Sequence, residues 1–329
     1  MILICYGTRP EFIKVKPLID GMITNGLKFK TLFTGQHKDI IDEFTPDYSL
    51  DIPNMGNRLN SVLSSGLIFE FPEDVTHVLI QGDTTSVVSM GMSAFNNGVK
   101  IIHLEAGLRT YDFENPYPEE ANRQLISRIS DINLCPTELN KQNLIAERAK
   151  GEHYVVGNTV LDNLVSYKDD CEYTNKVLIT LHRRENHERI EEYFEILDRI
   201  SDSYPELYFI LPIHPNPNVQ KHRHLLKNIK VVEPMNHSDL LKTLVKCKFV
   251  ITDSGGIQEE CSFFNKKVIV CRNITERPES VGKHSFMCEE PKLLYEMVSD
   301  INDDYEVNEP CPYGDGNSTE KILDIIKEL

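Results

Sequence analysis

The sequence of 329 residues has no long apolar run, and no segment approaches the ~20 apolar residues of a membrane-spanning helix. Its first residues, MILICYGTRPEF, lack the basic flank and the length of a signal peptide. Basic residues are also few, since 35 Lys and Arg stand against 51 Asp and Glu, a formal charge of -16. A nucleic-acid-binding surface needs a basic stripe. We therefore expect a cytoplasmic protein with neither a membrane nor a nucleic acid as partner.

Clustered metal ligands are missing as well. None of the eight cysteines forms a C-x-x-C pair, and most lie inside apolar runs such as ICYG, NLCP and VIVC. A zinc site needs ligands grouped at characteristic spacings, so we expect no metal site. The cysteines are interpreted as small buried residues of a protein kept in a reducing compartment.

The sequence does contain a regular alternation of short apolar runs and helical stretches. The runs are continuously apolar, which is typical of parallel sheets covered on both faces. Strands are expected at 1–6, 29–34, 77–81, 100–104, 131–135, 176–181, 207–212, 229–234, 248–252 and 267–271. Helices are expected at 10–24, 37–44, 58–70, 85–97, 119–130, 187–202, 237–245 and 255–264. This alternation predicts a doubly wound α/β fold.

The pattern restarts near residue 176, and the length exceeds the roughly 250–300 residues at which one core stops growing. We therefore predict two Rossmann-type domains, residues 1–165 and 166–316, with a linking helix at 158–167. The C-terminal helix, 317–329, could pack on either domain and is assigned to the first. Ligands of open α/β sheets bind beyond the carboxyl ends of the strands, so motifs at strand ends are the most informative.

The first strand ends in the segment GTRPE, residues 7–11. Its glycine permits a tight turn, Thr8 can cap the following helix, and Pro10 suits the first helical turn. Arg9 and Lys14 would then bracket a helix N-terminus, which is a ready anion site. The alternative is two solvated charges on a surface helix.

Three carboxylates follow in similar positions. Asp83 and Glu105 come directly after strands, and Glu119 lies in a first helical turn behind a proline. Crowded carboxylates shift one another's pKa values apart, which favours acid–base chemistry. Each also has a structural alternative, because Asp83 could cap a helix and Glu119 could favour the helix dipole. Glu105 could pair with Arg109 or Arg123.

Two histidines lie at strand ends in the second half. His182 opens the segment HRREN (182–186), the densest basic point in the chain, where a phosphate group would suit. His214 lies in the stiff loop HPNP, and a lone histidine of this kind is more often a structural hydrogen bonder.

A glycine turn follows a later strand of the second half, at Ser254, Gly255 and Gly256. Bare backbone N–H groups at such a helix start can hold a diphosphate, to which Ser254 adds a hydroxyl. Glu260 lies about one turn on and could accept hydrogen bonds from ribose hydroxyls. The segment is neither a P-loop nor G-x-G-x-x-G. Arg277 adds a cation near the same face.

Together these segments resemble the UDP-N-acetylglucosamine 2-epimerase family, most closely its non-hydrolysing branch. The matching motifs run in family order over nearly the whole chain: GTRPEFIK (7–14), QGDTTS (81–86), HLEAGLRT (103–110), PEEANR (118–123), PTELNKQNL (136–144), VGNTVLDNL (156–164), HRREN (182–186), HPNPNV (214–219), TDSGGIQEE (252–260), TERPE (275–279) and PYGDG (312–316). The resemblance implies a GT-B-like fold with the active site in the cleft between two domains, no cofactor, no metal, and a homodimer.

The family interconverts UDP-GlcNAc and UDP-ManNAc, so the resemblance implies reversible epimerisation at C2 of a UDP-sugar substrate. UDP leaves C1 by anti elimination, a 2-acetamidoglucal forms, and UDP then adds back. The implied catalytic residues are Asp83, Glu105, Glu119 and His182. The implied UDP-sugar-binding residues are Arg9, Lys14, His214, Ser254, Gly255, Gly256, Glu260 and Arg277.

Two other activities stay open. A hydrolysing 2-epimerase would use the same motifs and release ManNAc and UDP. A GT-B glycosyltransferase would share the fold and the diphosphate cradle, but it would need an acceptor and has no reason to gather three acids at the sugar C2.

Overall fold

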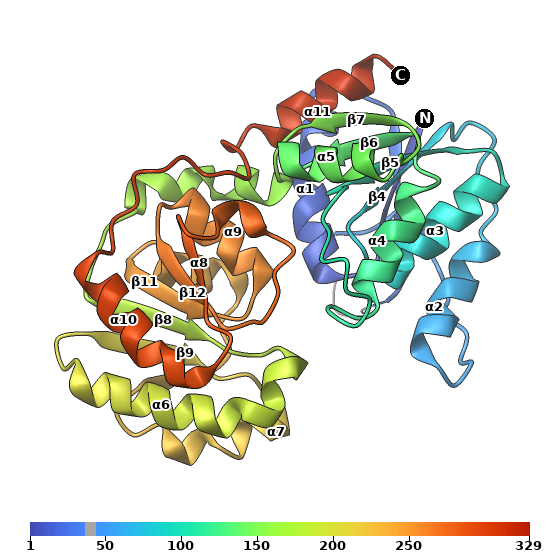
Figure 1. Ribbon diagram of the computed structural model, residues 1–329. Coiled ribbons are helices and arrows are strands. Elements are labelled where there is room, and N and C mark those ends of the chain that lie inside the picture. Colours follow the sequence, from blue (N-terminus) through green and yellow to red (C-terminus); the bar gives the residue numbers. More distant parts are fainter. Residues whose placement is uncertain (37–43) are drawn as a thin grey trace. The chain divides into compact units, whose positions relative to one another are not determined.

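The computed structural model describes residues 1–36 and 44–329, which form two compact units (Figure 1). The first unit comprises residues 1–163 and 314–329, and the second comprises residues 164–313. The chain therefore passes from one unit to the other twice. The first passage lies within the 3-10 helix η2 (Thr159–Asp170), where the sequence predicts a linking helix at 158–167, and the second lies at 313–314.

The first unit is built on a parallel sheet. Among the described residues its strands are β1 (Ile2–Tyr6), β2 (Phe29–Phe33), β3 (Tyr48–Ser49), β4 (His77–Gln81), β5 (Lys100–Leu104), β6 (Ile132–Cys135) and β7 (Glu152–Val155). Their order is β3-β2-β1-β4-β5-β6-β7. Successive strands are added outward in opposite directions from the β1–β4 pair. The carboxyl ends of β1 and β4 therefore flank the switch point at which open α/β sheets bind ligands.

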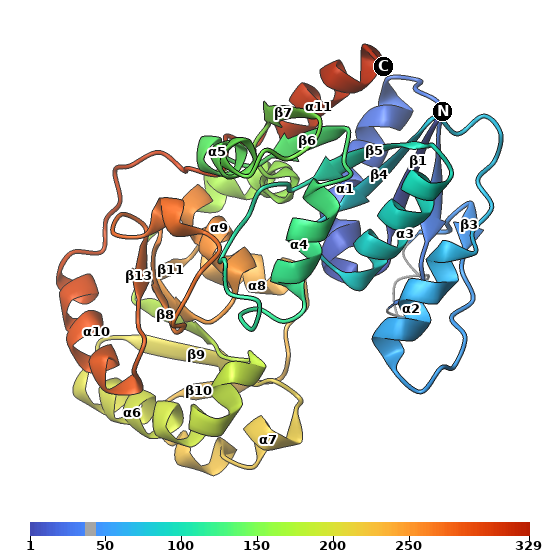
Figure 2. The ribbon, with the colours of Figure 1, turned by 45° about the vertical axis from the view of Figure 1, so that its right-hand side comes forward.

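Helices cover both faces of this sheet. They are α1 (Arg9–Thr24), α2 (Arg58–Leu67), α3 (Thr85–Asn96), α4 (Glu119–Ser127), α5 (Glu138–Ala146) and α11 (Ser318–Lys327). Side chains alternate along β1, so that Ile4 packs in one core with α1 and α11, and Leu3 packs in a second core with α3. Figure 2 shows α2 beside α3 on the second face. Burial on both faces explains why the central strands are continuously apolar.

The second unit repeats the plan. The strands among its described residues are β8 (Lys176–Thr180), β9 (Tyr208–Pro212), β10 (Lys230–Val232), β11 (Cys247–Thr252), β12 (Lys267–Val270) and β13 (Ser285–Met287). They are parallel, in the order β10-β9-β8-β11-β12-β13, with the switch point between β8 and β11.

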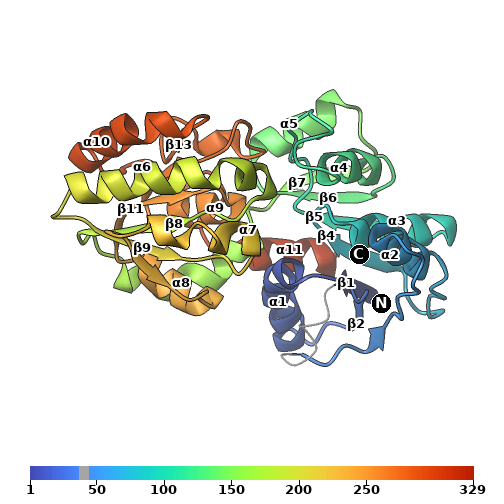
Figure 3. The same ribbon diagram turned by 90° about the horizontal axis from the view of Figure 1, so that it is seen from below.

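Helices flank this sheet as well. They are the 3-10 helices η3 (Arg184–Arg189), η4 (Arg223–Leu225), η5 (Pro278–Ser280) and η6 (Pro291–Leu293), and the α-helices α6 (Ile190–Ser203), α7 (Pro217–Gln220), α8 (His237–Leu244), α9 (Gly255–Phe263) and α10 (Leu294–Asp303). Figure 3 shows α6 and α10 on one face and α8 on the other. Phe194 of α6 and Val298 of α10 are fully buried in the core that they form against the sheet.

Each strand predicted from the sequence is present, and the strands that the sequence pattern missed are β3, β7 and β13. All three lie at sheet edges. Edge strands are not covered on both faces, so they lack the continuous apolar run on which the prediction depended. Helices α5, α7 and α10 were missed too, and the helix expected at 37–44 lies almost entirely outside the described residues.

The C-terminal helix α11 packs on α1, beside which it lies in Figure 1. Ile322, Leu323 and Ile326 of α11 are buried in the same core as β1 and α1. Asp162 holds the start of α11, because its carboxylate accepts the amides of Ser318 (3.1 Å) and Thr319 (2.6 Å). The last residues of the chain thus complete the core of the first unit.

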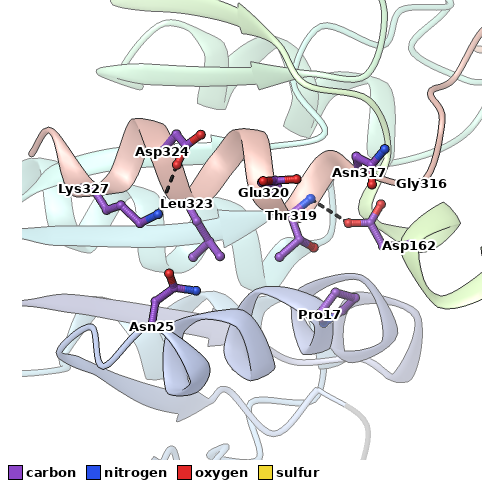
Figure 4. A pocket seen from close by; sticks show the side chains of 10 residues that line it. All are labelled: Pro17, Asn25, Asp162, Gly316, Asn317, Thr319, Glu320, Leu323, Asp324 and Lys327. Atoms are coloured by element: carbon purple, nitrogen blue, oxygen red, sulfur yellow. Dashed lines mark hydrogen bonds and ion pairs between the residues drawn. The ribbon is translucent and has the colours of Figure 1, made fainter.

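A pocket of about 480 Å³ lies beside this contact (Figure 4). Its lining comes from α1, from Asp162 and from α11, including Pro17, Leu323 and Asp324. The carboxylate of Asp162 points to the amide of Thr319 in this view, and the ammonium of Lys327 points to Asp324. None of the residues implied as catalytic or UDP-sugar-binding lines this pocket.

Replacing Ile322 by alanine should destabilise the first unit. Ile322 is completely buried, and truncation of a buried isoleucine costs about 2–5 kcal/mol because it leaves a cavity. The control is Leu329→Ala, since Leu329 is 53% exposed. Urea unfolding followed by circular dichroism should show a lower midpoint for Ile322→Ala alone. Equal midpoints would mean that α11 contributes nothing to the core.

Candidate functional site

The turn after β1 begins α1 through a capping box. Thr8 Oγ1 accepts the amide of Glu11 (3.4 Å), and Glu11 Oε2 accepts the amides of Gly7 (2.5 Å) and Thr8 (3.2 Å). Gly7 is required because a Cβ there would overlap the hydroxyls of Thr34 and Ser86. Arg9 is the first residue of α1 and is exposed. The turn therefore presents a cation at a helix N-terminus, as expected for an anion site.

Glu11 ties this turn to the turn after β4. Its second oxygen, Oε1, accepts a hydrogen bond from the hydroxyl of Thr84, which follows Asp83 in the chain. The side chain is almost completely buried. Burial raises the pKa of Glu11 to about 7, against the opposing effect of its hydrogen bonds with Thr84 and Gly7. One buried carboxyl thus links both sides of the switch point.

Glu105, directly after β5, is held by groups from three segments. Its Oε2 lies 2.5 Å from the ammonium of Lys14 and also accepts a hydrogen bond from the amide of Gln81. Asn158 Nδ2 lies 3.5 Å from Oε1. The alternative pairing with Arg109 is not what the structure has, because Arg109 pairs with Glu147 at 2.8 Å.

The backbone of Glu105 is also unusual. Its φ is +65°, in the left-handed region that residues other than glycine rarely adopt. Such conformations cluster at functional sites, where the surrounding structure holds them. The strained backbone and the ion pair with Lys14 both indicate that the surrounding structure holds the Glu105 carboxylate in one position.

Asp83 pairs with Arg123 of α4, with 2.7 Å between Oδ2 and Nη2. Arg123 is buried and its Nη1 lies 3.2 Å from Glu120, which is completely buried. Asn122 Nδ2 donates to the backbone carbonyl of Asp83 (2.7 Å). Asp83 does not cap a helix, since Thr84 is the N-cap of α3. The structural alternative for Asp83 is therefore wrong.

The turns that carry Asp83 and Glu105 are neighbours. A Cβ on Gly82 would lie 3.8 Å from Glu105 Oε2. The carbonyl of Gly82 is 2.8 Å from His103 Nε2, and burial lowers the pKa of His103 to about 4. The ring is therefore neutral at pH 7, and Nε2 must carry the proton that it donates to Gly82.

Glu119 is the first residue of α4. It precedes Asn122 and Arg123 by three and four positions, so the three residues share one face of the helix. Asn122 and Arg123 both bond to Asp83. The structure thus brings Asp83 and Glu105 together and directs the helix face of Glu119 to the same turn.

In the second unit, Asp253 holds the segment after β8. This completely buried carboxylate accepts the backbone amides of His182 (2.9 Å) and Arg183 (2.9 Å) and the side-chain amide of Asn186 (3.0 Å). Its Oδ1 also lies 3.2 Å from His182 Nδ1. Because β8 and β11 flank the switch point of this sheet, Asp253 fixes His182 at the edge where ligands bind.

The ring of His182 remains 40% exposed and stacks with His214, with centroids 6.0 Å apart and an interplanar angle of 22°. Burial, and then the neighbouring His182 and His187, lower the pKa of His214. The two histidines expected at strand ends therefore form one pair.

The N-terminus of α9 has no side-chain cap. Its N-cap, Ser254, makes no side-chain cap hydrogen bond. A Cβ on Gly256 would meet nothing nearer than Ser254 Oγ at 3.9 Å, whereas one on Gly255 would lie 2.5 Å from Arg277 Nη1. Gly255 is thus required by the approach of Arg277, and the first turn of α9 has the backbone N–H groups that can hold an anion at a helix start.

Arg277 is buried among carboxylates. Its Nε lies 2.5 Å from Glu259 Oε1, and its Nη1 pairs with Glu276. Glu276 also pairs with Arg272 at 3.0 Å. A buried charge needs such partners, and they fix the guanidinium beside the start of α9.

Glu260 has one oxygen in use and one without a hydrogen-bond partner among the described residues. Oε1 lies 2.8 Å from His237 Nε2, while Oε2 is buried and accepts no hydrogen bond. An unsatisfied buried acceptor costs about 1–3 kcal/mol. A ligand hydroxyl would relieve that cost.

Sequence reasoning did not assign roles to Glu11, Asp253 and His237. Glu11 carries a readable signal, since Thr8-x-x-Glu11 matches the capping box. Asp253 lies at a strand end, which is a weaker signal. His237 meets Glu260 only through the tertiary fold.

The described residues include neither a candidate metal site nor a candidate membrane-spanning helix. Within residues 1–36 and 44–329, no group of three or more His, Cys, Asp or Glu side chains could hold a metal ion. No helix in the same ranges is long and apolar enough to cross a membrane.

The chain is similar in sequence to proteins of one known family. A profile of the UDP-N-acetylglucosamine 2-epimerase family matches residues 23–327. A UDP-N-acetylglucosamine 2-epimerase of Campylobacter jejuni is 36% identical, over 99% of this chain and 97% of its own.

Two solved structures are similar throughout. UDP-GlcNAc 2-epimerase from Neisseria meningitidis, bound to UDP-GlcNAc, has a TM-score of 0.86 and 32% identity over 100% of both chains. S. aureus MnaA with UDP has a TM-score of 0.87 and 33% identity, over 99% of this chain and 96% of that chain. The fold is the GT-B-like fold that the sequence predicts, with two parallel-sheet α/β domains. The chain belongs to the UDP-N-acetylglucosamine 2-epimerase family.

Replacing Glu11 by glutamine should change the pH dependence of stability. The pKa of Glu11 is raised from 4.5 to about 7 in the folded state, so folding favours the protonated carboxyl. This contribution is fully present below about pH 4.5 and is lost as the pH rises through about 7. Wild type should therefore lose stability relative to Glu11→Gln across that window.

The measurement is urea unfolding at a series of pH values. Glu73→Gln, at an exposed glutamate, is the control and should follow wild type. Curves for wild type and Glu11→Gln that stay parallel from pH 4.5 to 7 would contradict the raised pKa.

Proposed function

We propose that the protein catalyses reversible epimerisation at C2 between UDP-N-acetylglucosamine and UDP-N-acetylmannosamine, without net hydrolysis. The observation that carries this proposal is the set of carboxylates at the β4 and β5 ends, Asp83 and Glu105, which pair with the buried Arg123 and the partly buried Lys14. Family membership supports it. The product would feed polysaccharide or glycoconjugate synthesis in the cytoplasm.

The proposed reaction begins with proton abstraction. A base takes the C2 proton, the C2–H electron pair becomes the C1–C2 double bond, and the C1–O bond breaks with its electrons going to UDP. In the return step a UDP oxygen attacks C1, and C2 takes a proton on the opposite face. The C2 proton is not acidic, so the leaving diphosphate must be stabilised, and acid and base groups must lie on both sugar faces.

The first unit supplies the acid–base groups in this proposal. They are Asp83, Glu105 and Glu119. Lys14 pairs with Glu105, and Arg123 pairs with Asp83. An ionised carboxylate can accept the C2 proton, and a protonated one can return it.

The second unit supplies the UDP site in this proposal. The N–H groups of Gly255 and Gly256, with Ser254 and Arg277, would bind the diphosphate. His182 and His214 would add donors beside it, and the unused oxygen of Glu260 would accept a ribose hydroxyl. We further propose that Arg9 binds the diphosphate from the first unit and that the protein is a homodimer.

Proton NMR of UDP-GlcNAc incubated with the protein in heavy water should show both epimers, with deuterium at C2 and no accumulation of free UDP. Epimerisation without deuterium uptake would exclude the elimination route. Free UDP and ManNAc that accumulate together would instead identify the hydrolysing branch. Reaction only after an acceptor is added would identify a glycosyltransferase.

Replacement of each carboxylate by its amide, as Asp83→Asn, Glu105→Gln and Glu119→Gln, should lower kcat by about 10²–10⁴-fold, the usual contribution of general acid–base catalysis. UDP affinity, measured by calorimetry, should change little, because the proposed UDP contacts lie mainly on the second unit. Glu73→Gln is the control for loss of one negative charge. A variant that weakens UDP binding as much as it slows turnover would count against a catalytic role for that residue.

A further inference from the structure

The second passage between the units runs through two consecutive residues, Tyr313 and Gly314. Tyr313 is the last residue of the second unit, and Gly314 is the first residue of the returning segment. Tyr313 is only 1% exposed. Each of the two residues has a neighbour in its own unit that belongs to the proposed site or touches it. For Tyr313 this neighbour is Arg277, and for Gly314 it is Asn158.

Tyr313 holds the main chain of Arg277. Its hydroxyl donates to the carbonyl of Arg277 (3.0 Å) and lies 2.9 Å from Ser280 Oγ. Burial raises the pKa of Tyr313, so the hydroxyl keeps its proton at neutral pH. Gln258 Nε2, from α9, donates to the same carbonyl (2.9 Å). The carbonyl is thus held by α9 on one side and by the passage between the units on the other.

The side chain of Arg277 is held both at its main chain and at its guanidinium. The guanidinium is clamped by Glu259 and Glu276, and it reaches the start of α9, where it would be 2.5 Å from a Cβ on Gly255. Because the side chain is held at both ends, a shift at the carbonyl would strain the ion pairs of the guanidinium that the proposal assigns to the diphosphate. The hydrogen bond of Tyr313 holds the main-chain end of this side chain.

Gly314 makes the corresponding contact in the first unit. A Cβ there would lie 3.2 Å from Gly157 Cα and 3.7 Å from the amide nitrogen of Asn158, and the φ of +126° is one that L side chains rarely adopt. Asn158 is buried, and its Nδ2 is 3.5 Å from Glu105 Oε1. The returning segment is thus packed against the residue that touches Glu105.

We propose that Tyr313 is a positioning residue for Arg277, and that the Tyr313–Gly314 junction couples occupancy of the diphosphate site to the segment beside Glu105. The inference rests on the proposed function for its assignment of Arg277 to the diphosphate. The coupling is a chain of contacts: Arg277 carbonyl, Tyr313 hydroxyl, the peptide bond to Gly314, Gly157–Asn158, and Glu105. A contiguous path of packed groups can carry energy between two sites in this way.

Tyr313→Phe tests the first half of the proposal. Loss of one neutral hydrogen bond to a buried carbonyl costs about 1 kcal/mol, so UDP should bind about fivefold more weakly in calorimetry, and KM for UDP-GlcNAc should rise in step. The matched control is Tyr173→Phe, because the hydroxyl of Tyr173 also donates to a backbone carbonyl of the second unit, that of Asn265. Tyr173→Phe should bind UDP as wild type does.

Hydrogen exchange tests the coupling. In wild type, UDP should slow amide exchange in residues 156–162, although the proposed phosphate contacts of Arg277 lie in the other unit. Tyr313→Phe at saturating UDP should lose most of this protection, and Tyr173→Phe should keep it. A role of Tyr313 in stability alone would lower the melting temperature and leave this difference unchanged.

Gly314→Ala tests the junction from the other side. It should lower kcat while UDP affinity stays within about twofold of wild type, because the added methyl presses on Gly157 and Asn158 rather than on Arg277. Gly56→Ala is the control, since Gly56 also has a positive φ (+80°) but nothing within 4 Å of an added Cβ. If Tyr313→Phe does not fold, Ser280→Ala removes the second partner of the hydroxyl and should weaken UDP binding two- to threefold.

The outcomes separate the two proposals. Wild type that binds no UDP would overturn the proposed function of the site. Wild type that binds UDP, with Tyr313→Phe equal to it in affinity and in hydrogen-exchange protection, would overturn the positioning role of Tyr313 and leave the proposed function standing.

Discussion

Charges that are buried at strand ends must be paired, and the arrangement of both candidate half-sites follows from that requirement. A carboxylate in a protein interior is stable only with a cation or several hydrogen-bond donors around it. Glu105 has Lys14, Asp83 has Arg123, and Arg277 has Glu259. Each pair joins segments that are distant in the chain, so the pairs that neutralise the charges also hold the turns in place.

The same constraint shows how a strongly acidic protein could offer the anion site proposed above. The formal charge is -16, yet the cations at the switch points are few and fixed. In the second unit, Asp253 is satisfied by backbone amides of the segment that follows β8, so its negative charge serves to hold that segment. The N-terminus of α9, at Ser254, has no side-chain cap, so its backbone N–H groups are the donors proposed for the diphosphate. The net charge of the protein therefore says little about such a site, because the local arrangement of donors and cations determines whether an anion can bind there.

The central strands could be predicted because burial on both faces demands a continuous apolar run, as in β1, β4, β8 and β11. The edge strand β7 could not, because its sequence, EHYV, is only partly buried. The candidate residues at strand ends could be found for a related reason. A polar residue within two positions of the end of an apolar run in a parallel sheet lies at the ligand-binding edge, which applies to Asp83, Glu105 and Ser254.

Partners of those residues were harder to predict. The bond between Tyr313 and Arg277 and the pair of His237 with Glu260 are tertiary contacts between separate segments. No local pattern encodes them. Pairing of Glu105 with Lys14 rather than with Arg109 depends on how α1 lies against β5, which sequence spacing does not reveal. The resemblance to a family supplied candidate positions, and the structure supplied their partners.

The position of helix α11 affects the order in which the two units can fold during synthesis. Its buried residues, Ile322, Leu323 and Ile326, belong to the core of the first unit, yet they are synthesised after the whole second unit. The second unit is contiguous in the chain, from 164 to 313, and can fold as soon as it emerges. The core of the first unit can close only after residues 314–329 have been added. Its completion therefore follows the synthesis of the second unit, whereas domains generally fold in order from the N-terminus.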